Sequence, residues 1–187
     1  MSGQIDYEIN KELGECYLFM GEVDKAEEYY IKASGSSGEH PDPYLGLATI
    51  AVHRGEMDKA MSLYKKAYQI KSEDKSLTGM GMLSMEAGNL AEGFGYLSEA
   101  LEHNPENLVA LFNLVQAAYA LNRLEEVVPR LHNCLALNPE QNDIRFSLAG
   151  CLVALARKPE AMQQLERILE ADAGHVAAQE LYAMLKS

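Results

Sequence analysis

Two Asn-Pro pairs, Asn104-Pro105 and Asn138-Pro139, stand 34 residues apart and limit the folds that this chain can adopt. Between them lie two stretches of about a dozen residues in which apolar side chains recur on one helix face. The apolar positions are Leu111, Leu114, Val115 and Ala118 in the first stretch and Leu124, Val127, Val128, Leu131 and Leu135 in the second. Neither helix is long enough to be stable alone in water, so each must bury its stripe against neighbours. A fixed period of this size, with two helices per period, indicates a stacked helical array.

The same period runs through the rest of the chain. Repeats begin at Tyr7, Pro41, Asp74, Leu108 and Asn142, and a last half-repeat begins at His175. Position 8 of the repeats is small or modest in size: Gly14, Ala48, Gly81, Val115 and Ala149. Position 24 is large: Tyr30, Tyr64, Leu97, Leu131 and Leu165. Small residues facing large ones at these spacings predict closely packed antiparallel helix pairs.

These repeats resemble the tetratricopeptide repeat (TPR) family. The residues that carry the resemblance are Leu13, Gly14, Tyr17, Gly21, Ala26, Tyr30 and Ala33 in the first repeat, and Tyr44, Leu47, Ala48, Gly55, Ala60, Tyr64 and Ala67 in the second. Three residues depart from the pattern: Arg145 replaces an aromatic residue, and Asn122 and Ala156 replace the glycine of the turn. The resemblance implies an all-α fold, a right-handed superhelix of antiparallel helix pairs with a C-terminal capping helix.

We therefore expect one TPR array over residues 1–187. The predicted repeats are 7–40, 41–73, 74–107, 108–141 and 142–174, followed by a capping helix over 175–187. The apolar side of that helix consists of Val176, Ala178, Leu181, Tyr182 and Leu185 and is expected to cover the last repeat.

Charge and composition narrow the class of partner and the compartment. The formal net charge is −12, and an acidic chain repels nucleic-acid phosphates and anionic membrane surfaces. No run of 18 apolar residues exists, which argues against direct membrane insertion. The first residues contain no apolar signal segment, so a cytoplasmic location is expected. Three cysteines, Cys16, Cys134 and Cys151, are expected to be free buried thiols in a reducing compartment.

No motif in the chain predicts catalysis, a cofactor or a metal. Gly79-Met80-Gly81 begins like a phosphate-binding loop, but Ser84 replaces the third glycine and no strand precedes it. The five histidines are scattered, and the cysteines lack the paired spacing of a zinc site. We therefore expect a protein that is not an enzyme and that has no catalytic, cofactor or metal-binding residues.

What remains is a binding surface. In TPR arrays the first helices of successive repeats line a concave groove, and repeat positions 2, 5, 9 and 12 usually face it. The resemblance therefore implies a groove that is charged at its N-terminal end and apolar or aromatic further along. The predicted partner-binding residues are Leu45, Thr49, Met82, Met85, Phe112, Gln116, Tyr119 and Phe146. An alternative is that Phe112 and Phe146 pack against adjacent helices instead.

The sequence thus predicts a non-enzymatic scaffold or adaptor that binds an apolar segment of a protein or peptide partner in this groove. Two alternatives stay open. The chain is a scaffold that self-assembles through the array ends into a homo-oligomer, or it is the targeting arm of a larger enzyme chain. The sequence does not identify the partner.

Overall fold

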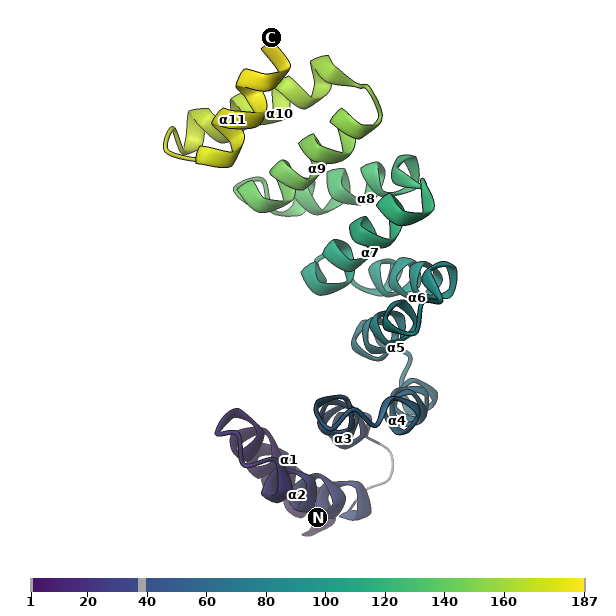
Figure 1. The fold of residues 1–187 in the computed structure, drawn as a ribbon. Coiled ribbons are helices and arrows are strands. Elements are labelled where there is room, and N and C mark those ends of the chain that lie inside the picture. Colours follow the sequence, from purple (N-terminus) through teal and green to yellow (C-terminus); the bar gives the residue numbers. More distant parts are fainter. Residues whose placement is uncertain (1, 37–39, 187) are drawn as a thin grey trace. The chain divides into compact units, whose positions relative to one another are not determined.

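The computed structural model describes residues 2–36 and 40–186, and these residues form eleven α-helices and no strand (Figure 1). The helices are α1 (Ser2–Phe19), α2 (Val23–Ser36), α3 (Asp42–His53), α4 (Met57–Ile70), α5 (Asp74–Glu86), α6 (Leu90–His103), α7 (Leu108–Leu121), α8 (Leu124–Leu137), α9 (Asn142–Ala154), α10 (Lys158–Ala171) and α11 (Val176–Lys186). The all-α fold expected from the sequence is confirmed.

The chain forms two compact units, an N-terminal half (Met1–Ala100) and a C-terminal half (Leu101–Ser187). Within each half, helices that follow one another in the chain pack together. In the N-terminal half α2 contacts both α1 and α3, and α4 contacts both α3 and α5. In the C-terminal half the same relation runs from α7 to α11. Such nearest-neighbour packing is typical of helical repeats. The division of one array into the five predicted repeats stays a prediction.

Two helix pairs pack closely because glycine stands at repeat position 8. A Cβ atom on Gly14 would lie 2.9 Å from the ring of Tyr30, and one on Gly81 would lie 2.7 Å from Leu97 Cγ. Both distances are shorter than real Cβ contacts allow. The large residue at position 24 thus fills the space that the missing side chain leaves. This confirms the small-to-large packing for these two pairs.

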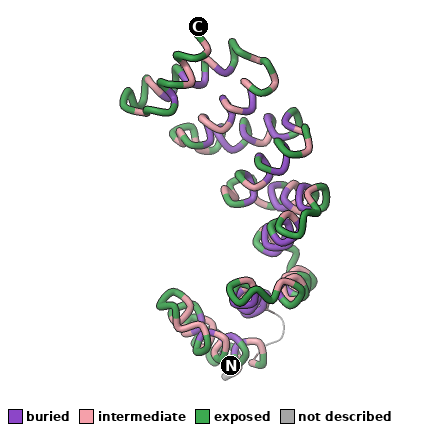
Figure 2. Tube along the Cα trace, in the orientation of Figure 1, coloured by how far each residue is buried: buried purple, intermediate pink, exposed green. Residues whose placement is uncertain are grey.

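Tyrosine also packs across to the following helix in the N-terminal half. The ring of Tyr30 on α2 occupies the space that a Cβ atom on Gly46 of α3 would need, and Tyr64 on α4 does the same at Gly79 of α5. Buried positions accordingly recur along the sides where helices meet, as Figure 2 shows. Each tyrosine therefore joins two consecutive helix pairs.

Tyr7 makes a further connection between α1 and α3. Its side chain is buried, and its hydroxyl donates a hydrogen bond of 2.9 Å to Asp42 Oδ2. The ring stacks on His40 with 4.0 Å between ring centroids. Burial, followed by the hydrogen bond to Asp42, raises the pKa of Tyr7 above its usual value. The neutral hydroxyl thus stays a donor across the physiological range.

The turns inside the helix pairs use a left-handed residue. Gly21, Gly55 and Gly88 have φ values of 77°, 74° and 81° in the N-terminal half, and Asn122 and Ala156 have φ values of 55° and 58° in the C-terminal half. The prediction that these two residues replace the turn glycine is confirmed. Alanine in this region is strained because its Cβ approaches the following carbonyl oxygen.

Arg145, which stands where an aromatic residue was expected, is buried in the C-terminal half. Its guanidinium group donates to Gln164 Oε1 at 3.1 Å and to the carbonyl oxygen of Pro139 at 2.6 Å. Burial lowers the pKa of Arg145. The side chain joins α9 to α10 and to the loop before α9. Arg145 thus connects these elements by hydrogen bonds at a position where an aromatic ring was expected.

Helix α11 covers the last helix pair as predicted, with one difference. Ala178 is fully buried in a cluster with Ala149, Leu165 and Ile168, and the partly buried Leu181, Tyr182 and Leu185 pack against that cluster. Val176 was predicted on the same side, but 62% of its surface is exposed. It is the first residue of α11 and lies away from the packed face.

Candidate functional site

Helix α7 in the C-terminal half exposes an aromatic face. Its opposite face is buried through Leu111, Leu114 and Ala118. On the exposed side, 38% of the surface of Phe112 and 45% of that of Tyr119 remain accessible. Gln116 is exposed between them. Large aromatic side chains dominate the energetics of interfaces, so this side of α7 is a candidate binding surface. We name Phe112, Gln116 and Tyr119 the α7 strip.

Tyr119 is held in place by α9. A Cβ atom on Gly150 would lie 3.3 Å from the Tyr119 hydroxyl, so that hydroxyl rests against α9 where no side chain intervenes. Burial, followed by the interaction with Cys151, raises the pKa of Tyr119 to about 12. The ring is therefore held at its polar end while 45% of the residue's surface stays accessible, which makes it a pre-organised contact.

Phe146 on α9 is less accessible than its position in the repeat suggested. It is half-buried and packs against the cluster under α11. Its ring centroid lies 5.6 Å from that of His175, just before α11. Phe146 thus contributes to the seat of the capping helix as well as to the surface beside it, and Phe112 is the more exposed of the two phenylalanines.

The other four predicted binding residues lie in the N-terminal half. Leu45 is half-buried, and Thr49 is exposed and donates to the carbonyl oxygen of Leu45 at 3.0 Å. Met82 is 43% exposed on α5. Met85 is half-buried, and its Cγ atom would lie 2.6 Å from a Cβ atom on Gly93, so it packs between α5 and α6. A strip that runs from these residues to the α7 strip stays a prediction.

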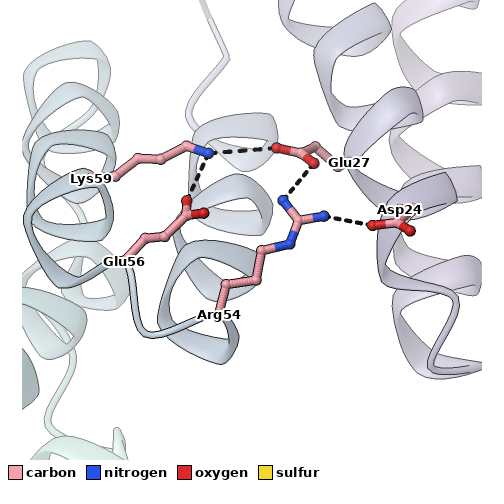
Figure 3. Close-up of polar contacts among 5 residues, drawn as sticks. All are labelled: Asp24, Glu27, Arg54, Glu56 and Lys59. Atoms are coloured by element: carbon pink, nitrogen blue, oxygen red, sulfur yellow. Dashed lines mark hydrogen bonds and ion pairs between the residues drawn. The ribbon is translucent and has the colours of Figure 1, made fainter.

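Sequence reasoning missed a cluster of ion pairs that joins α2 to the α3–α4 turn (Figure 3). Arg54 reaches Asp24 Oδ1 at 2.7 Å and Glu27 Oε2 at 2.6 Å. Lys59 lies 3.6 Å from Glu27 and 2.9 Å from Glu56. These side chains are at the surface, where ion pairs add little stability. The signal in the sequence was weak, because the acids Asp24 and Glu27 and the bases Arg54 and Lys59 stand at different repeat positions.

The potential metal ligands and the buried thiols of the described residues are not arranged for catalysis. Residues 2–36 and 40–186 contain no group of three His, Cys, Asp or Glu side chains placed to hold a metal ion. Burial raises the pKa values of Cys134 and Cys151, the opposite of what a nucleophilic thiolate needs. The prediction that all three cysteines are buried is wrong for Cys16, which is exposed on α1. Among the helices of residues 2–36 and 40–186, none combines the length and the hydropathy that a membrane-spanning helix needs.

Known proteins with helical repeats are similar to this chain in sequence. Two family models, both described as tetratricopeptide repeat, match the chain over residues 12–75 and over residues 84–128 and 124–185. The BBSome complex member BBS4 of Bos taurus is 33% identical over 109 residues, which cover 58% of this chain and 21% of BBS4. This chain therefore spans about a fifth of the length of that relative.

Two solved structures share the fold. The structure of PilF from Pseudomonas aeruginosa superposes with a TM-score of 0.78 at 20% identity, covering 99% of this chain and 85% of PilF. The structure of YrrB, described as a TPR protein with an unusual peptide-binding site, gives a TM-score of 0.69 at 16% identity and covers 92% of this chain and 89% of YrrB. At these identities the likeness concerns the fold alone.

Proposed function

Because the chain belongs to the tetratricopeptide repeat family, whose members generally mediate protein–protein interactions, we propose that it is a non-enzymatic scaffold that binds a partner protein on the α7 strip. The partner contributes an extended or helical apolar segment. The fold itself is one that serves interaction rather than catalysis, and TPR proteins bind protein or peptide partners.

The observation that carries the proposal is the exposure of two aromatic rings on one helix face. Phe112 and Tyr119 are seven positions apart, which places them two turns along the same side of α7. Both keep more than a third of their surface accessible although α7 buries its other face completely. Exposed apolar patches of this kind mark interaction sites in soluble proteins.

The fixed geometry of Tyr119 supports the same function. A ring that is already oriented loses little conformational freedom when a partner binds, so more of the contact energy contributes to affinity. Leu45, Thr49, Met82, Met85 and Phe146 stay predicted partner-binding residues, each within its own half of the chain. Among them, the exposed Met82 would offer an adaptable thioether contact.

A photo-crosslinking amino acid at position 112, with the same amino acid at position 137 as a matched control, would identify the partner segment. Leu137 is an exposed apolar residue of α8 in the same half of the chain. We expect a specific adduct from position 112 that mass spectrometry maps to an apolar segment. An equal adduct from position 137 would argue for non-specific capture.

The affinity of the identified segment then tests the role of the ring. Phe112→Ala should weaken binding by about 1–3 kcal/mol, the range for aromatic residues at interface hot spots, whereas Leu137→Ala should leave the affinity unchanged. If Phe112→Ala unfolds the chain, the ring is a core residue and the proposal fails. If the variant folds and binds normally, the partner binds elsewhere.

A further inference from the structure

Three positions in the first helix of a repeat form a receiving face for the preceding helix. These are repeat positions 3, 6 and 10, and they are buried in both inner repeats of the N-terminal half. The buried residues are Pro43, Gly46 and Ile50 in α3 and Ser76, Gly79 and Leu83 in α5. The same positions of consecutive repeats thus share one environment.

The structure also shows what covers this face. In α3 it is α2, whose Tyr30 ring lies on Gly46, and in α5 it is α4, whose Tyr64 ring lies on Gly79. The occupant is in each case an amphipathic helix that places its largest side chain over position 6. Glycine at position 6 leaves room for the ring.

In α1 the receiving face is uncovered. The equivalent residues Ile9, Glu12 and Cys16 are all exposed. Two further apolar residues extend the face at helical spacing, Ile5 with 59% and Phe19 with 94% of its surface exposed. Ile9 itself is 53% exposed. We name Ile5, Ile9, Glu12, Cys16 and Phe19 the α1 face. An apolar stripe of this length on one helix face is the mark of a surface that packs against another element.

The residue at position 6 determines which kind of partner side chain can pack on the α1 face. Glu12 replaces the glycine of α3 and α5, so its side chain takes the room that a tyrosine ring needs and presents a carboxylate instead. Lys11 lies 3.3 Å from Glu12 and 3.6 Å from Glu8, but Asp6 and Glu15 add further acid to the same helix. The first 40 residues contain nine acids and three bases. Although Lys11 already pairs with Glu12, the excess of acids on α1 favours an occupant that brings a cation toward Glu12.

We propose that the α1 face binds a positively charged amphipathic helix of another protein, with apolar side chains on Ile5, Ile9 and Phe19 and a lysine or arginine paired with Glu12. This surface is separate from the α7 strip, and the proposal does not depend on what that strip binds. A second copy of this chain is the poorer occupant because it would place the acids of α1 against its own. Charge complementarity across an interface favours the basic helix.

The chain itself supplies the probe. A fluorescent peptide with the sequence of α4, Met57–Ile70, reproduces a helix that already covers a receiving face. Three versions differ only at the residue that lies over position 6: the native Tyr64, Tyr64→Lys and Tyr64→Glu. Fluorescence anisotropy would measure their binding to the full chain. We expect the Tyr64→Lys peptide to bind at least about tenfold more tightly than the Tyr64→Glu peptide.

Variants of the protein test whether Glu12 causes that preference. Glu12→Lys should reverse the order of the two charged peptides, whereas Glu28→Lys, the same charge change on α2, should keep the order. Phe19→Ala should weaken binding of the Tyr64→Lys peptide about tenfold and leave the melting temperature unchanged, because Phe19 is almost fully exposed. Phe112→Ala should have no effect on this peptide.

The exposed Cys16 gives an independent readout at the centre of the face. Cys134 and Cys151 are buried, so a maleimide reacts first at Cys16, and the bound Tyr64→Lys peptide should slow that reaction. Three results would overturn the proposal: no binding by any of the peptides, an affinity that does not depend on residue 12, or unchanged reactivity of Cys16 under saturating peptide. A dimer in sedimentation velocity that Phe19→Ala abolishes would assign the face to a second copy and equally overturn it.

Discussion

The N-terminal and C-terminal halves connect consecutive helix pairs with different side chains. In the N-terminal half a tyrosine on one helix lies on a glycine of the next, as Tyr30 does on Gly46. In the C-terminal half the tyrosine position is held by the fully buried Leu131, and Ser147 stands where the glycine would be. A smaller residue on one helix is thus accompanied by a larger one on the other. We infer that the repeat conserves the volume between two helices rather than the identity of either residue.

Gly46→Ser should have the largest effect of the changes that test this comparison. The new side chain overlaps the buried Tyr30 ring, so we expect the free energy of unfolding to fall by about 3 kcal/mol, measured by urea denaturation. Adding Tyr30→Leu reproduces the leucine and serine pair of the other half and should recover part of the loss. If the double variant is no more stable than Gly46→Ser, compensation by volume is wrong.

The second difference between the halves lies at repeat position 4. In the N-terminal half, Tyr44 is buried, and Lys66 Nζ lies 4.3 Å from its ring centroid. In the C-terminal half, the buried residue at this position is itself a cation, Arg145. Arg145→Ala leaves the buried Gln164 Oε1 and the partly buried carbonyl oxygen of Pro139 without this donor and should lower stability by about 2 kcal/mol. Arg145→Lys keeps the charge but not the planar fork of donors, so it should be intermediate. Full stability of Arg145→Ala would show that water satisfies both acceptors.

The turn residues give a smaller effect of opposite sign. Ala156 has a left-handed conformation, which costs an alanine about 1–2 kcal/mol. Replacing it with glycine removes this cost, but part of the gain in stability is offset because glycine is more flexible in the unfolded chain. Ala156→Gly should therefore raise stability by about 1 kcal/mol, whereas Gly55→Ala, the converse change in the N-terminal half, should lower it by a similar amount. Thermal denaturation of both variants measures the pair. Equal signs would contradict the assignment of the two turns to one geometry.

The smallest effect is expected at the surface ion pairs. Arg54 contacts two acids of α2, and Arg157 in the C-terminal half contacts Glu125 at 3.4 Å and Glu160 at 2.7 Å. Exposed pairs are weak and screened by salt. Arg54→Ala should lower the melting temperature slightly in low salt, and the difference from wild type should vanish near 1 M NaCl, where screening acts within about 3 Å. A loss that persists in high salt would mean that the Arg54 side chain acts through packing.

Much of this fold was predictable because it depends on local pattern. Helix faces, pair packing at Gly14, and left-handed turns at Asn122 and Ala156 all follow from spacing within one repeat. The exposure of Phe112 follows from its repeat position in the same way. Each of these features is set by residues that are near one another in sequence.

What the sequence did not predict depends on contacts beyond one repeat. Cys16 shares its repeat position with the buried Cys151, but burial there requires a preceding helix, which α1 does not have in the described residues. Phe146 packs toward His175 because α11 follows it, whereas the repeat pattern treats every first helix alike. The ion pairs of Arg54 depend on the conformations of long side chains on separate helices. A pattern of charges in the sequence does not specify those conformations.

The hydrogen bond from Tyr7 to Asp42 has a consequence for the time course of folding. Tyr7 and Asp42 are 35 positions apart in the sequence. The residues of the other contacts that join α1, α2 and α3 are separated by a similar number of positions or by fewer. Chains with such local contacts have a low contact order and fold within microseconds to milliseconds. All the residues that join these three helices have been synthesised once Arg54 is added. The N-terminal helices are therefore able to assemble during translation, before any residue of the C-terminal half exists.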